Sequence, residues 1–323
     1  MMIDLNYGEN YREVILLKHQ IEEKIASSLG IPKNQVMLNY GSNSNLILFF
    51  SAYSVKFLHD KKRKLKVLLD FPNYFFTLTQ LKEWFIDSRF VKRDKEMNFP
   101  FENFVKAIKE YDPDVILLTT PNNPTGKPIK DDELTKIINS ASKDTIILID
   151  RSCVNVLPEI STKELLTKFK NKKIVVLHSF SKSHSLSDER LGYLATNSIE
   201  IAEFLYNKRD LNHNINAVKK LIKILDDEKI LKQKREIIKK CNSILKEYFE
   251  KKNSKYFESY SNFALIQLPS NLSSEFVEES LSKKGILVMG GHKIGLGNRY
   301  IRLHMSGISE IKKFIQEFEK IEK

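Results

Sequence analysis

Lys182 is the residue of this 323-residue chain whose neighbours point most strongly to chemistry. It ends the string Ser179-Phe-Ser-Lys182, which begins shortly after the apolar run 174–177, and Arg190 follows a few positions later. The apolar run predicts a buried strand, so the lysine is expected on the loop at the carboxyl end of that strand. There its amine can form a Schiff base, with serines and an arginine nearby to bind a phosphate group. On this string alone, an ordinary exposed loop lysine is an equally good interpretation.

Two more polar side chains follow apolar runs in the same way. Asn123 lies in Thr120-Pro-Asn-Asn-Pro-Thr-Gly126, after the run 115–118, and Asp150 directly follows another apolar run. The intervals from Asn123 to Asp150 and on to Lys182 each suit one strand–helix–strand unit. Ligands of open α/β sheets collect at the carboxyl ends of the strands, so we expect the three side chains to meet in one site. Taken singly, the asparagine also suits a turn and the aspartate a helix cap.

The order and spacing of these motifs resemble the fold-type I pyridoxal phosphate enzymes, specifically class I and II aminotransferases close to the histidinol-phosphate aminotransferase branch. The resemblance runs from about Tyr11 to Arg302 and is carried by Asn-Asn-Pro-Thr-Gly and by Ser-x-Ser-Lys with its following arginine. It implies pyridoxal 5′-phosphate (PLP) as cofactor and amino and 2-oxo acids as substrates. It also implies a homodimer with each site at the subunit interface.

The resemblance gives the site residues their expected roles. Lys182 would hold the cofactor and then move the proton at the substrate Cα, while Asp150 would keep the pyridine nitrogen protonated. Asn123 would donate a hydrogen bond to the phenolic oxygen of the ring, and Tyr74 would stack on the ring. The remaining cofactor-binding residues would surround the phosphate: Gly41, Ser42, Asn43, Ser179, Ser181, Arg190 and, from the neighbouring subunit, Tyr11.

Two of these expectations have structural alternatives that stay open. Gly41-Ser-Asn-Ser-Asn45 precedes a helical run, 46–53, which would place free backbone N–H groups next to a phosphate. A polar helix cap explains the same loop equally well. Tyr74 in turn could be a buried core residue.

Residues from the carboxyl-terminal part would contact the substrate. Arg302 matches the arginine that binds the substrate carboxylate or its equivalent, because a planar guanidinium binds a carboxylate with two parallel hydrogen bonds. Asn262 matches an asparagine that lines the site. The function expected is transfer of an amino group between a small amino compound, with or without a phosphate, and a 2-oxo acid. A decarboxylase of amino-acid phosphates with the same fold is one alternative, and a non-catalytic PLP-fold binding protein is another.

The sequence departs from the family pattern at three places. Cys153 stands three residues after Asp150, where the family usually has an aromatic residue, and a thiol is a weak hydrogen-bond donor. The segment 185–189 replaces the glycines usual between the lysine and the arginine. The part that precedes the phosphate loop is shorter than is usual in the family, which puts an amino-terminal lid in doubt.

Composition is that of a globular protein, with 41% hydrophobic and 29% charged residues. The net charge is +12, but the lysines are spread along amphipathic helices, so attraction of an anionic substrate explains the charge better than nucleic-acid binding. No apolar run is long enough for a membrane span, and the two cysteines predict no disulfide framework. We therefore expect a cytoplasmic protein that binds neither membrane nor nucleic acid. The seven histidines show no metal-ligand spacing, so no metal is expected.

Apolar strands alternating with helical patterns predict an α/β fold, and the resemblance makes it the PLP-transferase fold type I. We expect a large PLP-binding domain, 36–205, with a mostly parallel sheet flanked by helices. A smaller α+β domain would occupy 206–323, and an amino-terminal segment, 1–35, would pack with it. Strands are expected at 67–69, 115–118, 146–149, 174–177, 192–195, 264–268, 286–289 and 300–304.

Overall fold

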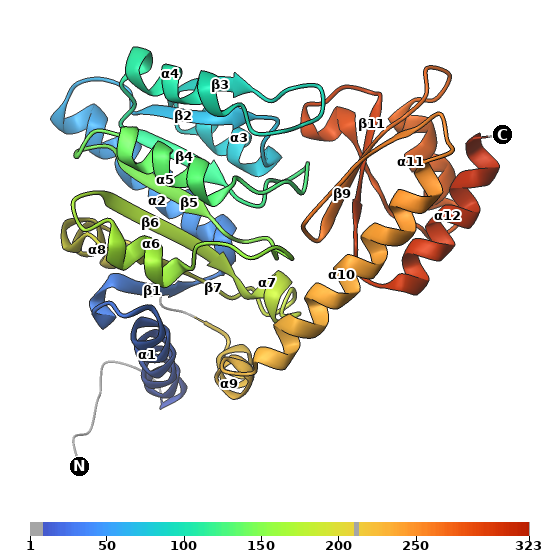
Figure 1. Cartoon of the computed structure of the whole chain (residues 1–323). Coiled ribbons are helices and arrows are strands. Elements are labelled where there is room, and N and C mark those ends of the chain that lie inside the picture. Colours follow the sequence, from blue (N-terminus) through green and yellow to red (C-terminus); the bar gives the residue numbers. More distant parts are fainter. Residues whose placement is uncertain (1–8, 210–212, 323) are drawn as a thin grey trace.

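The computed structural model describes residues 9–209 and 213–322 (Figure 1). Its larger sheet has seven strands in the order β1-β7-β6-β5-β4-β2-β3. Strands β2 to β6 run parallel, whereas β7 is antiparallel to both β6 and β1, which confirms the expected mostly parallel sheet. The strands are β1 Val36–Asn39, β2 Lys66–Phe71, β3 Asp87–Lys92, β4 Val115–Thr119, β5 Ile146–Asp150, β6 Lys173–Ser179 and β7 Gly192–Thr196.

Helices cover both faces of this sheet (Figure 1). Its central strands β4 and β5 are therefore buried along their whole length. One hydrophobic cluster joins the strands to helices α1, α4, α5, α6 and α9, and a second joins them to α2, α3 and α8. The first group is α1 Glu9–Leu29, α4 Phe101–Tyr111, α5 Asp131–Ser140, α6 Thr162–Lys168 and α9 Ile215–Ile224. The second is α2 Gly41–Asp60, α3 Phe75–Glu83 and α8 Ile199–Tyr206.

The carboxyl-terminal part forms a separate layer, which lies beside the large sheet in Figure 1. Its antiparallel sheet has the order β10-β11-β9-β8, and helices α10, α11 and α12 share a hydrophobic cluster with it. Helix α10 runs from α9 to this layer. The elements are α10 Glu228–Phe249, β8 Lys255–Phe257, β9 Phe263–Gln267, α11 Ser274–Ser282, β10 Met289–Gly290, β11 Tyr300–His304 and α12 Ile308–Glu322.

The strand expected at 286–289 is mostly wrong, since the observed strand covers only Met289–Gly290. The residues before it form the turn that follows α11, where Gly285 has a φ of +72° and the Leu287 side chain is 85% exposed. An apolar run therefore does not guarantee a strand when a glycine with positive φ directly precedes it.

The expected domain boundaries stay predictions. Helix α1 packs on β1 and α6 as well as on α9, which lies within the range expected for the small domain. Buried side chains of α9 belong to the same hydrophobic cluster as the large sheet. The contacts of α1 therefore connect it to residues on both sides of the expected boundary.

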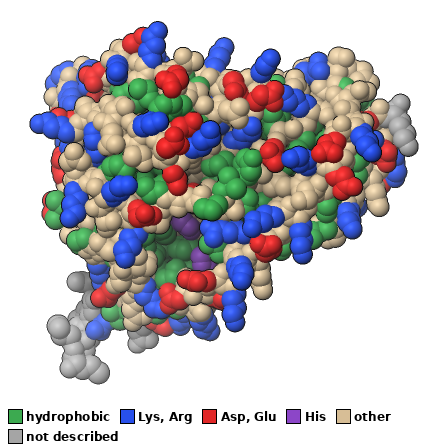
Figure 2. Space-filling model, viewed as in Figure 1, with side chains coloured by type: hydrophobic (Ala, Val, Ile, Leu, Met, Phe, Trp, Pro, Cys, Tyr) green, Lys and Arg blue, Asp and Glu red, His purple; other side chains and the backbone are tan. Residues whose placement is uncertain are grey.

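The surface carries charge of both signs. On the face shown in Figure 2, lysine and arginine side chains are spread over the molecule with acidic side chains between them. No helix in the ranges 9–209 and 213–322 is long and apolar enough to cross a membrane. The same residues contain no group of three or more His, Cys, Asp or Glu side chains placed to hold a metal ion.

Candidate active site

The carboxyl ends of the parallel strands open onto a cavity of about 420 Å³ between the two layers. Strand β4 ends at Thr119, β5 at Asp150 and β6 at Ser179, so the sheet itself brings these positions to one edge. Ten of the expected site residues line the cavity: Ser42, Asn43, Tyr74, Asn123, Asp150, Ser179, Ser181, Lys182, Arg190 and Arg302.

Lys182 lies on α7 Phe180–Ser183, a single helical turn directly after β6. The turn is capped by Ser179, whose hydroxyl accepts a hydrogen bond from the Ser181 N–H. Burial lowers the pKa of Lys182, and the positive charges of Arg302 and Arg190 act in the same direction. A lowered pKa favours the neutral amine, which is the form that attacks a carbonyl carbon and accepts a proton.

Asp150 is only 4% exposed and has an incomplete set of partners. Its Oδ1 accepts hydrogen bonds from the N–H and the hydroxyl of Ser152, and among the described residues no cation pairs with it. Burial raises the pKa of Asp150, because the low-dielectric surroundings penalise the charged form. A protonated ring nitrogen in the cavity would supply the missing positive charge.

Asn123 and Arg302 meet across the cavity from opposite layers. The Arg302 guanidinium donates a hydrogen bond to Asn123 Oδ1 at 2.8 Å and also lies over the Phe263 ring, 4.5 Å from its centroid. Because the carbonyl oxygen of Asn123 is occupied, its NH₂ group is left to donate towards a ligand.

The amino terminus of α2 provides an anion site at another wall of the cavity. The Tyr40 side chain at the N-cap makes no cap hydrogen bond to the first N–H groups of this long helix. Gly41 has a φ of +78°, and a Cβ there would lie 3.6 Å from the Arg190 guanidinium. The Ser181 hydroxyl is buried with no hydrogen-bond partner among the described residues. A phosphate would satisfy these donors together.

Tyr74 follows β2 and is held in the wall by two hydrogen bonds. Its hydroxyl donates to Asn43 Oδ1 at 3.3 Å, and its backbone N–H donates to Asn73 Oδ1 at 2.7 Å. The ring is half-buried and lines the cavity, so it is not a fully enclosed core residue.

Two expected residues differ from the rest. Asn262 lines a smaller neighbouring cavity of about 120 Å³ that it shares with Lys182 and His304. Its Oδ1 accepts a hydrogen bond from the Val154 N–H, while its buried Nδ2 has no partner among the described residues. The Tyr11 side chain lies outside the described residues.

Several residues of the cavity wall were not singled out in the sequence. Ser152 follows Asp150, and Phe263 follows Asn262, so their positions next to expected residues were the available signal. Thr119 directly follows a predicted strand, whereas Met289 and His304 end predicted strands, and Ser187 lies in the segment 185–189. Phe75 carried no recognisable pattern.

The cavity thus offers a lysine with a lowered pKa, a buried carboxylate that lacks a cation, and an uncapped helix terminus beside an arginine. These groups fit the Schiff base, the pyridine nitrogen and the phosphate of PLP, respectively. Such a fold and such a cavity are those of the PLP-dependent enzymes of fold type I.

The chain belongs to the aminotransferase class I and II family, whose model matches residues 14–317, and it is a PLP-dependent transferase. It is 26% identical over 313 residues to the histidinol-phosphate aminotransferase of Caldicellulosiruptor saccharolyticus, covering 94% of this chain and 81% of that relative.

Solved structures share the fold. The histidinol-phosphate aminotransferase from Clostridium acetobutylicum superposes with a TM-score of 0.82 at 22% identity, over 97% of this chain and 95% of that one. A decarboxylase from Sulfurospirillum multivorans gives a TM-score of 0.81 at 20% identity, over 100% of this chain and 96% of the other. At these identities the likeness concerns the fold alone.

Proposed function

We propose that this aminotransferase acts on a small amino compound that carries an anionic group, a phosphate being the first to test, and passes the amino group to a 2-oxo acid. The observation that carries the proposal is the charge of the cavity. Lys182, Arg190 and Arg302 line it, whereas Asp150 is the sole acidic residue among the described residues of its wall. Positive charge in a recessed site attracts anionic substrates.

Bound PLP supplies an electron sink for the pair released at the substrate Cα. In the proposed division of roles, the Lys182 amine would move the proton at that Cα. Asp150 would keep the pyridine nitrogen protonated, Asn123 would donate a hydrogen bond to the phenolic oxygen, and Tyr74 would pack on the ring.

The phosphate of the cofactor would be bound by the start of α2, with Gly41, Ser42 and Asn43, and by side chains that follow β6. The latter are Ser179, Ser181 and Arg190. Arg302 would bind the anionic group of the substrate, which the hydrogen bond from Arg302 to Asn123 supports because it links substrate and cofactor contacts. Asn262 would line the substrate side from the neighbouring small cavity.

We also propose that the protein is a cytoplasmic homodimer in which Tyr11 of one subunit reaches the cofactor phosphate of the other. The family resemblance supports the dimer. Cys153 and Cys241 form no disulfide with each other, which suits a reducing compartment.

The proposal is tested by mixing the purified holoenzyme with histidinol phosphate, other amino phosphates and common amino acids. The absorption spectrum of the cofactor and any CO₂ released are followed for each compound. A pyridoxamine-type spectrum that 2-oxoglutarate reverses is expected with anionic amines. Stoichiometric CO₂ instead would identify a decarboxylase, and a spectrum unchanged by every compound would indicate a non-catalytic binding protein.

A further inference from the structure

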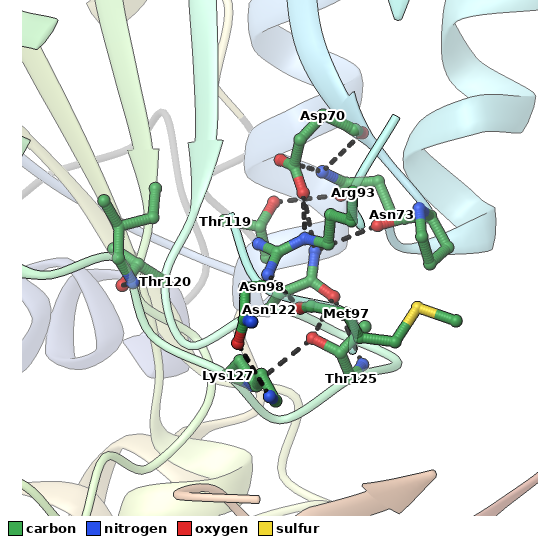
Figure 3. Close-up of polar contacts among 12 residues, drawn as sticks. Asp70, Asn73, Arg93, Met97, Asn98, Thr119, Thr120, Asn122, Thr125 and Lys127 are labelled. Atoms are coloured by element: carbon green, nitrogen blue, oxygen red, sulfur yellow. Dashed lines mark hydrogen bonds and ion pairs between the residues drawn. The ribbon is translucent and has the colours of Figure 1, made fainter. Parts of the chain in front are cut away.

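A buried ion pair lies beside the cavity without lining it. Asp70 is near the end of β2 and Arg93 directly follows β3, and both side chains are 0% exposed. Arg93 Nε donates to Asp70 Oδ2 at 2.6 Å (Figure 3). Burying two charges is unfavourable unless each is well paired, so this pair calls for a structural or functional explanation.

The two carboxylate oxygens of Asp70 bind different loops. Oδ1 accepts a hydrogen bond from Asn73 Nδ2 at 3.1 Å, in the loop between β2 and α3. Oδ2 accepts one from Asn122 Nδ2 at 3.3 Å, in the loop between β4 and α5. One side chain thereby joins two loops that are far apart in the sequence (Figure 3).

Each asparagine directly precedes a residue of the cavity wall. Asn73 precedes Tyr74 and accepts a hydrogen bond from its backbone N–H at 2.7 Å. Asn122 precedes Asn123 and also donates to the Pro72 carbonyl at 3.1 Å, which ties the two loops together a second time. A shift of Asp70 would therefore be transmitted to both residues that contact the ring in the proposed site.

The remaining bonds of the two asparagines fix their amide orientation. Asn73 Oδ1 accepts the Thr119 hydroxyl at 2.9 Å, and Asn122 Oδ1 accepts the Thr125 hydroxyl at 2.9 Å. With the oxygens of both amides occupied, only their NH₂ groups can face Asp70. Asp70 therefore accepts on both oxygens, and the ionised carboxylate does so without directing a proton at an amide NH₂ group.

Arg93 favours the ionised form of that carboxylate, because it donates a charged hydrogen bond to it. Burial raises the pKa of Asp70, and the charge and hydrogen bond of Arg93 oppose this rise. The arginine is itself fixed, because its Nη1 donates to the Met97 carbonyl at 3.0 Å and its backbone N–H to the Phe71 carbonyl at 2.8 Å.

We propose that Asp70, kept charged by Arg93, is a positioning residue that sets the placement of Tyr74 and Asn123 relative to each other at the cofactor ring. This inference rests on the proposed roles of those two residues. Neither member of the pair touches the cavity, so they act through the loops. Catalytic groups need placement to within a fraction of an ångström, which loop residues do not achieve unless other side chains hold them.

The test compares the double variant Asp70→Asn/Arg93→Met with the wild-type holoenzyme. Removing both charges avoids leaving one buried charge unpaired, but the asparagine can no longer accept on two oxygens. Asn122→Ala is a second variant, which keeps the ion pair and removes the hydrogen bond from Asn122 to Asp70. Glu22→Gln is the control for a general loss of stability, because Glu22 and Arg209 form another buried pair, with side chains 2% and 1% exposed. Among the described residues, the hydrogen bonds of Glu22 go to Arg209 and to the Leu38 N–H, neither of which lines the cavity.

Three quantities are measured: the dissociation constant of PLP, the pH midpoint of the visible band of the bound cofactor, and the melting temperature. For the double variant we expect PLP to bind about tenfold more weakly, and the midpoint to rise by about one pH unit as Asn123 becomes a poorer donor to the phenolic oxygen. Asn122→Ala should raise the midpoint by a smaller amount. Glu22→Gln should lower the melting temperature without changing the midpoint.

Wild-type PLP affinity and midpoint in Asn122→Ala, or in a folded double variant, would overturn the assignment. An equal shift in Glu22→Gln would also overturn it, since a general loss of stability would then explain the result. If the wild-type protein itself forms no visible band with PLP, the proposed function fails as well. The two failures are therefore distinguishable.

Discussion

The two walls of the cavity are built on different principles. The wall on the large sheet takes Asp150 from the end of β5 and Lys182 from the turn α7 directly after β6, where the backbone of the sheet fixes their places. The wall on the small sheet takes Arg302 and His304 from within β11, where alternation turns every second side chain towards the cavity. Fixed strand ends suit groups that act on the cofactor, and side chains along a strand face suit contacts that differ between substrates. Substitutions in the first wall should therefore affect the chemistry, and those in the second should affect substrate choice.

The largest effect is expected from Lys182→Ala, which should abolish covalent attachment of PLP and all turnover. The fold should persist, because the change removes one loop side chain and no core volume. Borohydride reduction followed by mass spectrometry checks this, with the label expected on Lys182 alone. Lys234→Ala is a suitable control, since that lysine lines the small neighbouring cavity and should leave the label in place. A label on another lysine would contradict the assignment.

Asp150→Ala should lower turnover roughly a thousandfold or more while PLP still binds through its phosphate. The pyridine nitrogen would lose the anion that keeps it protonated. Asp150→Asn preserves the size of the side chain and should lose nearly as much, because an amide carries no charge. Turnover close to wild type in the asparagine variant would mean that Asp150 only caps the segment after β5, through Ser152.

Arg302→Ala should distinguish the roles of the two walls. We expect KM to rise far more for anionic substrates than for neutral amines, by about 2–5 kcal/mol in binding free energy, because a desolvated guanidinium contact is lost. Steady-state kinetics with one substrate of each kind measure the difference. Equal losses for both would show that the arginine acts mainly through Asn123, to which it donates a hydrogen bond.

The difference between a wall built from strand ends and a wall built from side chains along a strand also determined what could be predicted from the sequence. Around the large sheet, the apolar runs 115–118, 146–149 and 174–177 predicted both the strands and the place where their polar neighbours meet. Parallel strands buried on both faces leave a continuous apolar signal, so they are easy to recognise. Strand β3 was missed because its exposed positions give it no such run.

The contribution of the small sheet to the cavity wall was harder to predict. Strand β11 was located correctly, but β8 is only three residues long and gave no pattern. Phe263, Met289 and His304 reach the cavity through the packing of one layer on the other, which is a tertiary contact that periodicity does not encode. The Asp70–Arg93 pair was missed for the same reason, since its partners come from three separate loops.

The smallest expected effect concerns Cys153, at the place where the sequence departs from its family. Cys153 lines the cavity, and burial raises the pKa of its thiol to about 12, so it remains protonated at neutral pH. Because a thiol is a weak donor, the phenolic oxygen of the ring would depend mainly on Asn123. Cys153→Tyr should add a hydroxyl donor and lower the pH midpoint of the visible band, which is a spectroscopic titration.

Two substitutions make this result interpretable. Cys153→Ser adds a hydroxyl without adding bulk. If the midpoint shifts only in the tyrosine variant, the hydroxyl must stand on a side chain long enough to contact the phenolic oxygen. Cys241→Ser alters the buried cysteine of α10, away from the cavity, and should leave the midpoint unchanged. An unchanged midpoint in a folded Cys153→Tyr variant would mean that this position does not face the ring, and that the hydrogen bonding of the phenolic oxygen rests on Asn123 and the loop that Asp70 holds.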